Sequence, residues 1–496
     1  MKIKPIYLLF VFFFFIIFCN KVKAEVLVST IPELNQAIAA AKPGDVITMK
    51  DGIWHDANIN FNSKATMSAK TTLRAQNAGK VILNGSSKLI FSAPYLIVDG
   101  LFFKEGALTQ SSNSVVTFGS AYCRLTNVAI VNYNPLTFDT KYYWVYFQGS
   151  YNRMDHCVFK GKNHMQPVVQ NDEENSLYNN VDSCYIKDIP YITDANGREI
   201  FRIFGYGHAD QTGDGGAYFT IEYNLFDHAD GEGTEIVSLK SNHNLVQYNT
   251  VISSRGGLVG RRGKNNTFHG NFILGQNYAG STGIRVAGSN HRVTNNYIAD
   301  VAEDGLRLIT GEYYEKSLTD KFAPKKKALP KYLQVKGGYF ANNTIVNCGG
   351  YGIDIGFAYK NQWPSLQMVL FPEDNHFENN IVYNTKAPVI HEPEIDKKAP
   401  LDGFSFKPNY FSKNIVFGNT SSMRSTSEGF KVVNPMLKLN KSGLYFMDNL
   451  SPAINFGSLA FQNEVIIAPG QTGLKANSKT QIFPISADQV GPKWWR

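Results

Sequence analysis

A lysine and two arginines occupy two segments of this sequence in an arrangement that could act on an acidic substrate. Lys240 lies near the end of the segment Thr234–Ser241, and Arg261 and Arg262 stand before Gly263, twenty-one and twenty-two positions further on. If the chain coils with a period near that length, these cations face one another across a short gap. A neutral lysine beside arginines is suited to act as a general base close to a carboxylate.

A short motif, in which Asn, Gly or Cys stands between two apolar pairs, recurs along most of the chain. Its markers are Gly100, Asn127, Cys157, Cys184, Asn224, Asn249, Asn271, Asn296 and Asn343, with weaker copies at Asn380 and Asn414. Steps of about 20 to 50 residues are typical of solenoids. We therefore predict an all-β fold, a single-stranded right-handed parallel β-helix rather than a sandwich or a propeller. The repeated Asn is interpreted as a structural ladder whose amides cap the turn of the next coil.

The repeat places the cations on three consecutive coils. Lys240 and Arg262 each lie nine residues before the marker Asn of their own coil, and Arg285 lies eleven before its marker. Adjacent parallel strands are about 4.8 Å apart, so we expect one basic patch. Crowding of like charges favours the neutral amine form of Lys240. Spacing alone leaves open a solvated basic stripe without catalysis.

A helix is expected to cap the start of the stack. Thr30 and Glu33 have the spacing of a capping box, and the apolar stripe that follows predicts a helix through Ala41. Pro43-Gly44-Asp45 ends this helix, and Val46–Met49 reads as the first strand. One amphipathic helix before many strands is the cap that an open stack requires.

Two unusually long distances between successive markers of the repeat, and the loosening of the repeat near the C-terminus, indicate the domain organisation. Loops are predicted around 193–198 and at 312–331, and the second contains the charge run Lys325–Lys327. We expect residues 25–403 to form the β-helix. Residues 404–496, where the repeat loosens, are expected to form a C-terminal capping and lateral region of the same domain.

The first 24 residues are typical of a secretory signal. Lys2 and Lys4 precede an apolar run from Leu8 to Phe18, and Val22-Lys23-Ala24 is a small-residue cleavage pattern. The uninterrupted apolar run of about 14 residues is short of the roughly 20 needed to span a membrane. We expect residues 1–24 to be a signal peptide and the chain to be exported, to the periplasm or the extracellular medium, with no membrane span.

Composition narrows the class of protein and partner. Hydrophobic residues make up 43% and charged residues 18% of the chain, and Gly, Tyr and Phe are plentiful, as expected for strands joined by tight turns. Four cysteines follow the signal, and they predict neither a disulfide framework nor a zinc site: Cys123, Cys157, Cys184 and Cys348. A net charge of +8 favours a polyanionic partner, either nucleic acid or acidic polysaccharide.

The segments around the cations resemble polysaccharide lyase family 6, which contains alginate lyases and chondroitinase B, all on parallel β-helices. The resemblance is carried by Thr234–Ser241, Asn249-Thr250, Arg261-Arg262-Gly263, Gly283–Val286 with Gly288 and His291, and Asn295–Tyr297. It extends from Pro43-Gly44-Asp45 and Asp51-Gly52 to Asn343-Thr344, and Val490-Gly491-Pro492 also fits alginate-active members.

The resemblance implies β-elimination on a uronic-acid polymer, with acidic polysaccharide rather than nucleic acid as the partner. Lys240 matches the base that removes the proton at C5. Arg261 matches the arginine that acts as acid or electrostatic stabiliser at the departing O4. Spacing alone would select Arg262 as the direct neighbour of Lys240, so the choice of Arg261 rests on the resemblance. The remaining candidates, for substrate binding, are Arg262, Arg285, Glu235, Arg307 and Tyr351.

The metal of the family is not expected here. Many members hold a calcium ion with an Asn and two Glu, and Asn196 and Glu235 match two of these positions. Gly233 stands at the third, and Glu232 beside it is expected to point elsewhere if the local backbone is regular. Loss of a carboxylate weakens a calcium site. Because Arg262 also replaces the usual His, we expect a calcium-independent enzyme in which arginine or lysine neutralises the substrate carboxylate.

The sequence thus predicts an exported lyase that cleaves alginate and leaves an unsaturated uronate. Within the enzyme class, the alternative is a chondroitinase-like activity on dermatan sulfate. Outside it, the alternative is a non-catalytic β-helix that binds acidic polysaccharide. A pectinolytic hydrolase is disfavoured, because the sequence shows no clustered Asp set with paired general-acid and general-base carboxylates.

Overall fold

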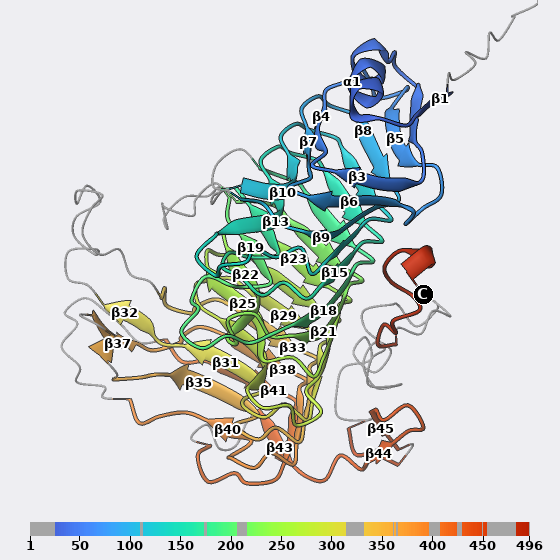
Figure 1. The fold of residues 1–496 in the computed structure, drawn as a ribbon. Helices are drawn as coiled ribbons and strands as arrows, with labels where there is room; N and C mark the ends of the chain where they lie inside the picture. Colours follow the sequence, from blue (N-terminus) through green and yellow to red (C-terminus); the bar gives the residue numbers. More distant parts are fainter. Residues whose placement is uncertain are drawn as a thin grey trace, which may run out of the picture.

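Three long parallel sheets, each supplying one strand to most coils, build the computed structural model of this chain (Figure 1). The structure describes residues 25–109, 113–172, 176–205, 216–313, 332–360, 362–363, 366–395, 407–423, 429–448, 450–453 and 483–495. Sheets A and B have 14 strands each and sheet C has 12. The predicted parallel β-helix is confirmed. The predicted signal peptide and Lys325–Lys327 lie outside the described residues.

From β3 to β31 the strands follow one another in the order B, C, A. Sheet A contains β1 (Glu25–Val28), β2 (Val46–Met49), β5 (Thr71–Ala75), β8 (Leu96–Asp99), β11 (Arg124–Thr126), β14 (Arg153–Asp155), β17 (Asn180–Asp182), β20 (Thr220–Glu222), β23 (Leu245–Gln247), β26 (Thr267–His269), β29 (Arg292–Thr294), β33 (Tyr339–Ala341), β38 (His376–Glu378) and β41 (Tyr410–Ser412). Sheet B contains β3 (Gly52–His55), β6 (Val81–Gly85), β9 (Leu101–Gly106), β12 (Ala129–Val131), β15 (Val158–Lys160), β18 (Tyr185–Ile189), β21 (Leu225–Ala229), β24 (Thr250–Ile252), β27 (Phe272–Leu274), β30 (Tyr297–Ala299), β34 (Thr344–Val346), β39 (Ile381–Tyr383), β42 (Asn414–Phe417) and β43 (Phe430–Val432).

Sheet C is the one that carries the candidate catalytic residues. It contains β4 (Asn58–Phe61), β7 (Lys88–Phe91), β10 (Asn113–Phe118), β13 (Tyr142–Phe147), β16 (Val169–Asn171), β19 (Phe201–Ile203), β22 (Glu235–Lys240), β25 (Gly256–Arg262), β28 (Ser281–Val286), β31 (Leu306–Ile309), β35 (Ile353–Phe357) and β40 (Ile390–His391). Outside the three sheets lie β32 (Gly311–Tyr313), β36 (Gln362–Trp363) and β37 (Leu366–Leu370), and the hairpin of β44 (Leu437–Leu439) and β45 (Tyr445–Met447).

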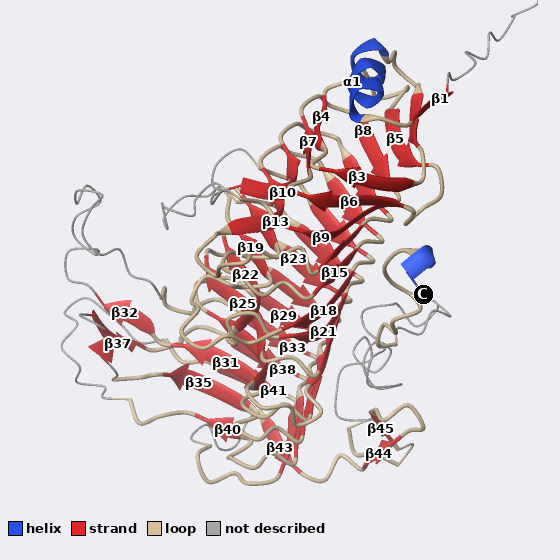
Figure 2. Ribbon diagram, viewed as in Figure 1, coloured by secondary structure: helices blue, strands red, loops and turns tan. Residues whose placement is uncertain are grey.

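The predicted helical cap is present at one end of the stack as α1 (Ile31–Ala40), as Figure 2 shows. Thr30 is its N-cap, and its hydroxyl accepts the Glu33 N–H at 3.3 Å. The Glu33 carboxylate in turn accepts the Ser29 N–H at 2.7 Å. Leu34 and Ile38 are fully or almost fully buried, so the apolar stripe covers the first coil.

The repeated Asn forms the predicted ladder. In each step the side-chain oxygen of one Asn accepts both the backbone N–H and the side-chain N–H of the Asn on the preceding coil, at 2.9–3.1 Å. The ladder runs through Asn224, Asn249, Asn271, Asn296, Asn343, Asn380 and Asn414. Cys184 precedes it, and its N–H donates to Asn224 at 2.9 Å. These buried amides therefore set the register of successive coils.

Apolar side chains fill the interior between the sheets. Rings on neighbouring strands of sheet C stack directly, with centroids 4.8 Å apart for Phe91 and Phe118 and 4.5 Å apart for Phe118 and Phe147. This spacing is that of adjacent strands, so each coil adds one ring to the column. The described cysteines are buried and free.

Three segments lie against the stack without joining its three sheets. One is the hairpin of β44 and β45, where the Tyr445 N–H donates to the Tyr297 hydroxyl at 2.9 Å. β32 pairs antiparallel with β37 beside β31 and β35 (Figure 1). The described C-terminal residues 483–495 lie along sheet B, where Trp494 and Trp495 contact Phe102. Among the described residues, no helix is long and apolar enough to cross a membrane.

Candidate active site

A β-bulge positions the two arginines next to Lys240. On β22 and β25, Leu239 pairs with Gly260 and Lys240 pairs with Arg262, which leaves Arg261 as the extra residue. Bulges change the direction of a side chain and are frequent next to active sites. The prediction from spacing that Arg262 pairs with Lys240 is therefore confirmed. The bulge allows Arg261 to line the same cavity as Lys240 and Arg262.

Lys240 and both arginines line one cavity on the outer face of sheet C. The cavity has a volume of about 170 Å³ and is lined by Phe204, Lys240, Arg261 and Arg262. The Lys240 ammonium nitrogen lies 5.5 Å from the centre of the Phe204 ring. Burial and the neighbouring Arg261 lower the pKa of Arg262. A cavity walled by three cations is suited to a polyanion and provides an amine that could act as a base.

Two buried carboxylates balance these cations. Glu199 Oε1 lies 2.6 Å from Lys240 Nζ, and Glu199 Oε2 lies 3.4 Å from Arg202. Glu235 contacts Arg285 directly and lies 3.5 Å from Arg261 Nε. Burial alone would raise the pKa of Glu235, but Arg285, Arg261 and Lys240 hold it below its ordinary value. Sequence reasoning missed Glu199, which lies at the end of the predicted loop 193–198.

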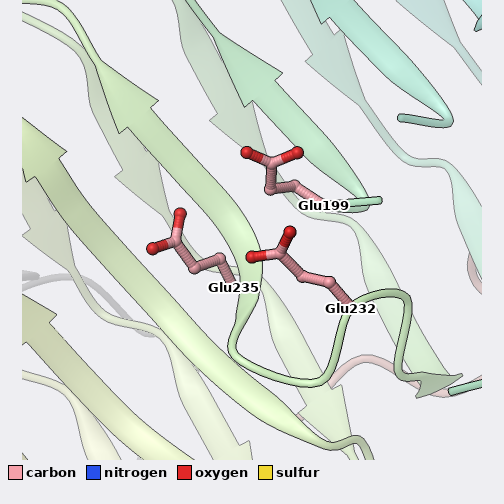
Figure 3. A group of neighbouring side chains, drawn as sticks. All are labelled: Glu199, Glu232 and Glu235. Carbon is pink, nitrogen blue, oxygen red and sulfur yellow. The ribbon is translucent and has the colours of Figure 1, made fainter. Parts of the chain in front are cut away.

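A third carboxylate, that of Glu232, points toward the other two (Figure 3). Oxygen atoms of Glu199, Glu232 and Glu235 all lie within 4.8 Å of one another. The expectation that Glu232 points elsewhere was wrong, because the backbone before β22 is not regular: Gly231 and Gly233 adopt φ of +57° and +82°. Burial, with Glu199 and Glu235 nearby, raises the pKa of Glu232 to about 7.

The acidic cluster does not match the calcium site of the family. A side chain at position 233 would collide with neighbouring groups, since a Cβ there would lie 2.7 Å from the Tyr191 ring and 2.8 Å from Arg255 Nε. Asn196 is exposed in the turn before β19. Calcium needs six to eight oxygen ligands, whereas the oxygens of Glu199 and Glu235 already face lysine and arginine. The residues present therefore do not fit the ion.

Arg307 and Tyr351, the two remaining candidates for substrate binding, lie close to each other. Arg307 is three strands along sheet C from Lys240, and Tyr351 lies just before the fourth strand. Arg307 on β31 is in register with Arg285 and forms a salt bridge of 2.7 Å with Asp304. The Tyr351 N–H donates to the same Asp304 at 2.8 Å, and the Tyr351 ring stacks on His391. Arg307 thus continues the line of cations away from the cavity.

Some motif residues serve the coil rather than the cavity. His291 is buried, accepts the Asn266 N–H at 3.2 Å and lies 3.0 Å from the Ala287 carbonyl oxygen. A Cβ at Gly288 would lie 2.0 Å from the Gly263 carbonyl oxygen, so only glycine fits this close approach. The motif that carries the family resemblance therefore contains residues of the cavity and also residues, such as His291 and Gly288, that hold the tight turns between strands.

The comparisons with known proteins agree with this geometry. The family model for chondroitinase B matches residues 28–462. A polysaccharide lyase of family 6 from Pseudopedobacter saltans, Pedsa3628, is 44% identical over 95% of this chain and 99% of its own, with a TM-score of 0.77. The family 6 alginate lyase AlyGC is 25% identical over 95% of this chain and 59% of its own, with a TM-score of 0.76. A mannuronic acid specific family 6 lyase from human gut microbiota is 26% identical over 83% of this chain and 91% of its own, with a TM-score of 0.68.

A comparison with curated proteins gave no match. The family model and the 44% identity to Pedsa3628 show that this parallel β-helix is a polysaccharide lyase. Within that class, the chain belongs to polysaccharide lyase family 6, the family of the chondroitinase B model.

Proposed function

We propose that this chain cleaves alginate by β-elimination, with Lys240 as the base and Arg261 at the leaving oxygen. The observation that carries the proposal is that Lys240, Arg261 and Arg262 line one cavity. Alginate is a polymer of uronates, and each uronate presents a carboxylate beside the C5 hydrogen that must be removed. Similarity to AlyGC and to the mannuronic acid specific lyase favours alginate over other uronate polymers.

The proposed reaction balances as follows. The neutral amine of Lys240 takes the C5 proton, and the C5–H electron pair forms the C4–C5 double bond. The C4–O4 bond breaks, and its electron pair leaves with O4, which is protonated by solvent or by Arg261. The guanidinium of Arg261 stabilises the negative charge that develops on O4. An enolate-like charge also develops on the substrate carboxylate, and Arg262 is assigned to neutralise it.

A spectroscopic assay tests the substrate and the roles together. The chain is incubated with alginate, dermatan sulfate and pectate, and the near-ultraviolet absorbance of the new double bond is followed. We expect a signal on alginate. A signal only on dermatan sulfate would favour the alternative that the chondroitinase B model suggests. No signal on any polymer would overturn the proposal and favour a binding role.

The residue roles are tested by Lys240→Ala and Arg261→Ala, which should each abolish turnover without loss of the fold. Both side chains are on the outer face of β22 and β25 and do not belong to the apolar core. Retention of most activity by Lys240→Ala would show that another group is the base. Thermal unfolding of both variants provides the check that the coils remain intact.

A further inference from the structure

The guanidinium of Arg261 lies on an aromatic ring that comes from outside the three sheets. Arg261 Cζ is 3.9 Å from the centre of the Tyr332 ring, while Arg261 Nε is 3.5 Å from Glu235 Oε1. A cation over the face of an aromatic ring is attracted by the ring quadrupole, and the attraction grows as water is excluded. The Arg261 side chain is only 16% exposed. A carboxylate and an aromatic ring therefore both contact this largely buried side chain.

Tyr332 is itself firmly held. The Glu312 N–H donates to the Tyr332 carbonyl oxygen at 2.9 Å, and the Glu312 side chain is 2% exposed on β32. The Tyr332 ring packs against a small apolar cluster of Ala287, Ile309 and Met368, which is separate from the main core. Met368 belongs to β37, the antiparallel partner of β32. The pair of strands outside the stack thus holds an aromatic ring against Arg261.

A second arginine on sheet C is supported in the same way. Arg307 Cζ lies 4.1 Å from the centre of the Phe357 ring, and Phe357 packs against the same apolar cluster as Tyr332. Arg307 lies three strands along sheet C from Lys240, and Arg261 only one. One apolar cluster therefore supports two aromatic rings that contact arginines. Tyr332 contacts Arg261, and Phe357 contacts Arg307, which lies further along sheet C.

We propose that Tyr332 is a positioning residue that orients the Arg261 guanidinium toward the leaving oxygen of the substrate, through the face of its ring. The inference rests on the proposed function, because it assigns Tyr332 to the step that Arg261 performs. Arg261 and Arg262 carry like charges next to Lys240, and the negative face of the ring offsets part of their repulsion. The phenol hydroxyl has no part in this role, so an unsubstituted phenyl ring should serve equally well.

Kinetics of ring variants test the proposal on alginate. Tyr332→Leu should lower kcat by about tenfold and leave KM within about twofold, since a lost cation–π contact near a buried charge corresponds to about one decade. Tyr332→Phe should keep kcat within about twofold of the wild-type value. Phe357→Leu should instead raise KM by about threefold or more with little change in kcat, because Arg307 lies away from the reacting atoms.

A matched control is available on another sheet. Arg292 lies over the ring of Tyr339 at 4.9 Å on sheet A, so Tyr339→Leu removes the same kind of contact far from the cavity. It should leave kcat and KM unchanged. In an Arg261→Lys background, Tyr332→Leu should add little to the loss of kcat, because the two changes act on one contact.

Fluorinated phenylalanines at position 332 keep the shape of the ring and protect the test against misfolding of Tyr332→Leu. Each added fluorine weakens the negative face, so kcat should fall stepwise with fluorination. An unchanged kcat across the fluorinated series, or a Tyr332→Phe variant as slow as Tyr332→Leu, would overturn the role of the ring. A wild-type chain that acts on none of the polymers would instead overturn the proposed function. The two failures are therefore distinguishable.

Discussion

The ammonium nitrogen of Lys240 lies 2.6 Å from a carboxylate oxygen of Glu199, and the Glu199 side chain is 2% exposed. An ion pair of this kind fixes the position of the amine. The proposed base must lie beside the C5 hydrogen of the substrate to take its proton. Glu199 is therefore expected to place Lys240 for proton transfer.

Glu199→Gln should test whether this contact places the base. We expect kcat to fall by about tenfold, because the amine loses the charged partner that orients it. Steady-state kinetics on alginate measure the loss, and thermal unfolding of the variant shows whether the coils remain intact. A kcat equal to that of the wild-type chain would show that Glu199 does not place Lys240.

Removal of divalent cations should leave the activity intact. Position 233 is a glycine and supplies no carboxylate, and Glu199 and Glu235 are already paired with lysine and arginine. Initial rates on alginate should agree within about twofold with and without EDTA, and added calcium should not raise them. A rate that vanishes in EDTA and returns only with calcium would contradict this. AlyGC under the same conditions serves as a comparison from the same family.

The pH dependence of stability should report on Glu232. Burial and the carboxylates of Glu199 and Glu235 raise the pKa of Glu232 from 4.5 in the unfolded chain to about 7. A raised pKa in the folded state means that the folded protein binds the proton more tightly. The resulting stabilisation is complete below about pH 4.5 and is lost as the pH rises through about 7.

Urea unfolding of Glu232→Gln at about pH 5 and about pH 8 measures this contribution. The wild-type chain should lose about 1–3 kcal/mol more stability between these conditions than the variant does. Glu105→Gln is the control, because the Glu105 side chain is 73% exposed and lies on sheet B. It should retain the wild-type pH dependence. Equal pH dependence in Glu232→Gln and the wild-type chain would show that Glu232 ionises normally.

The features that sequence reasoning found are those that repeat or that lie at a fixed distance from the repeat. The Asn markers located the coils, and counting from them placed Arg262 opposite Lys240, as the register of β22 and β25 confirms. The helix cap and the strand Val46–Met49 followed from local patterns. Val46–Met49 is not the first strand, however, because Glu25–Val28 forms a strand before the helix and was not predicted. These signals depend on periodicity, so they could be read without tertiary structure.

Residues that irregular backbone places at the site could not be predicted from the repeat. Glu199 follows a loop that lengthens the step between the markers Cys184 and Asn224 to 40 residues, so no repeat position predicts it. Glu232 reaches the cluster only because Gly231 and Gly233 adopt positive φ. Tyr332 lies at the end of the excursion from the stack and meets Arg261 across about 70 residues of sequence, a contact that only the antiparallel pairing of β32 and β37 establishes.

Stability of the coils should depend on single amides of the Asn ladder. Asn271 is fully buried; its side-chain oxygen accepts two N–H groups of Asn249 at 3.1 Å, and its amide donates to Val246 and Asn296. Asn271→Ala would leave buried donors and acceptors without partners, at a cost of about 2–4 kcal/mol. We expect a lower urea midpoint and faster amide hydrogen exchange in the coils on either side. Asn58→Ala, at an exposed position of β4, should change neither. Equal stability of Asn271→Ala and the wild-type chain would show that the backbone ladders hold the register without the amides.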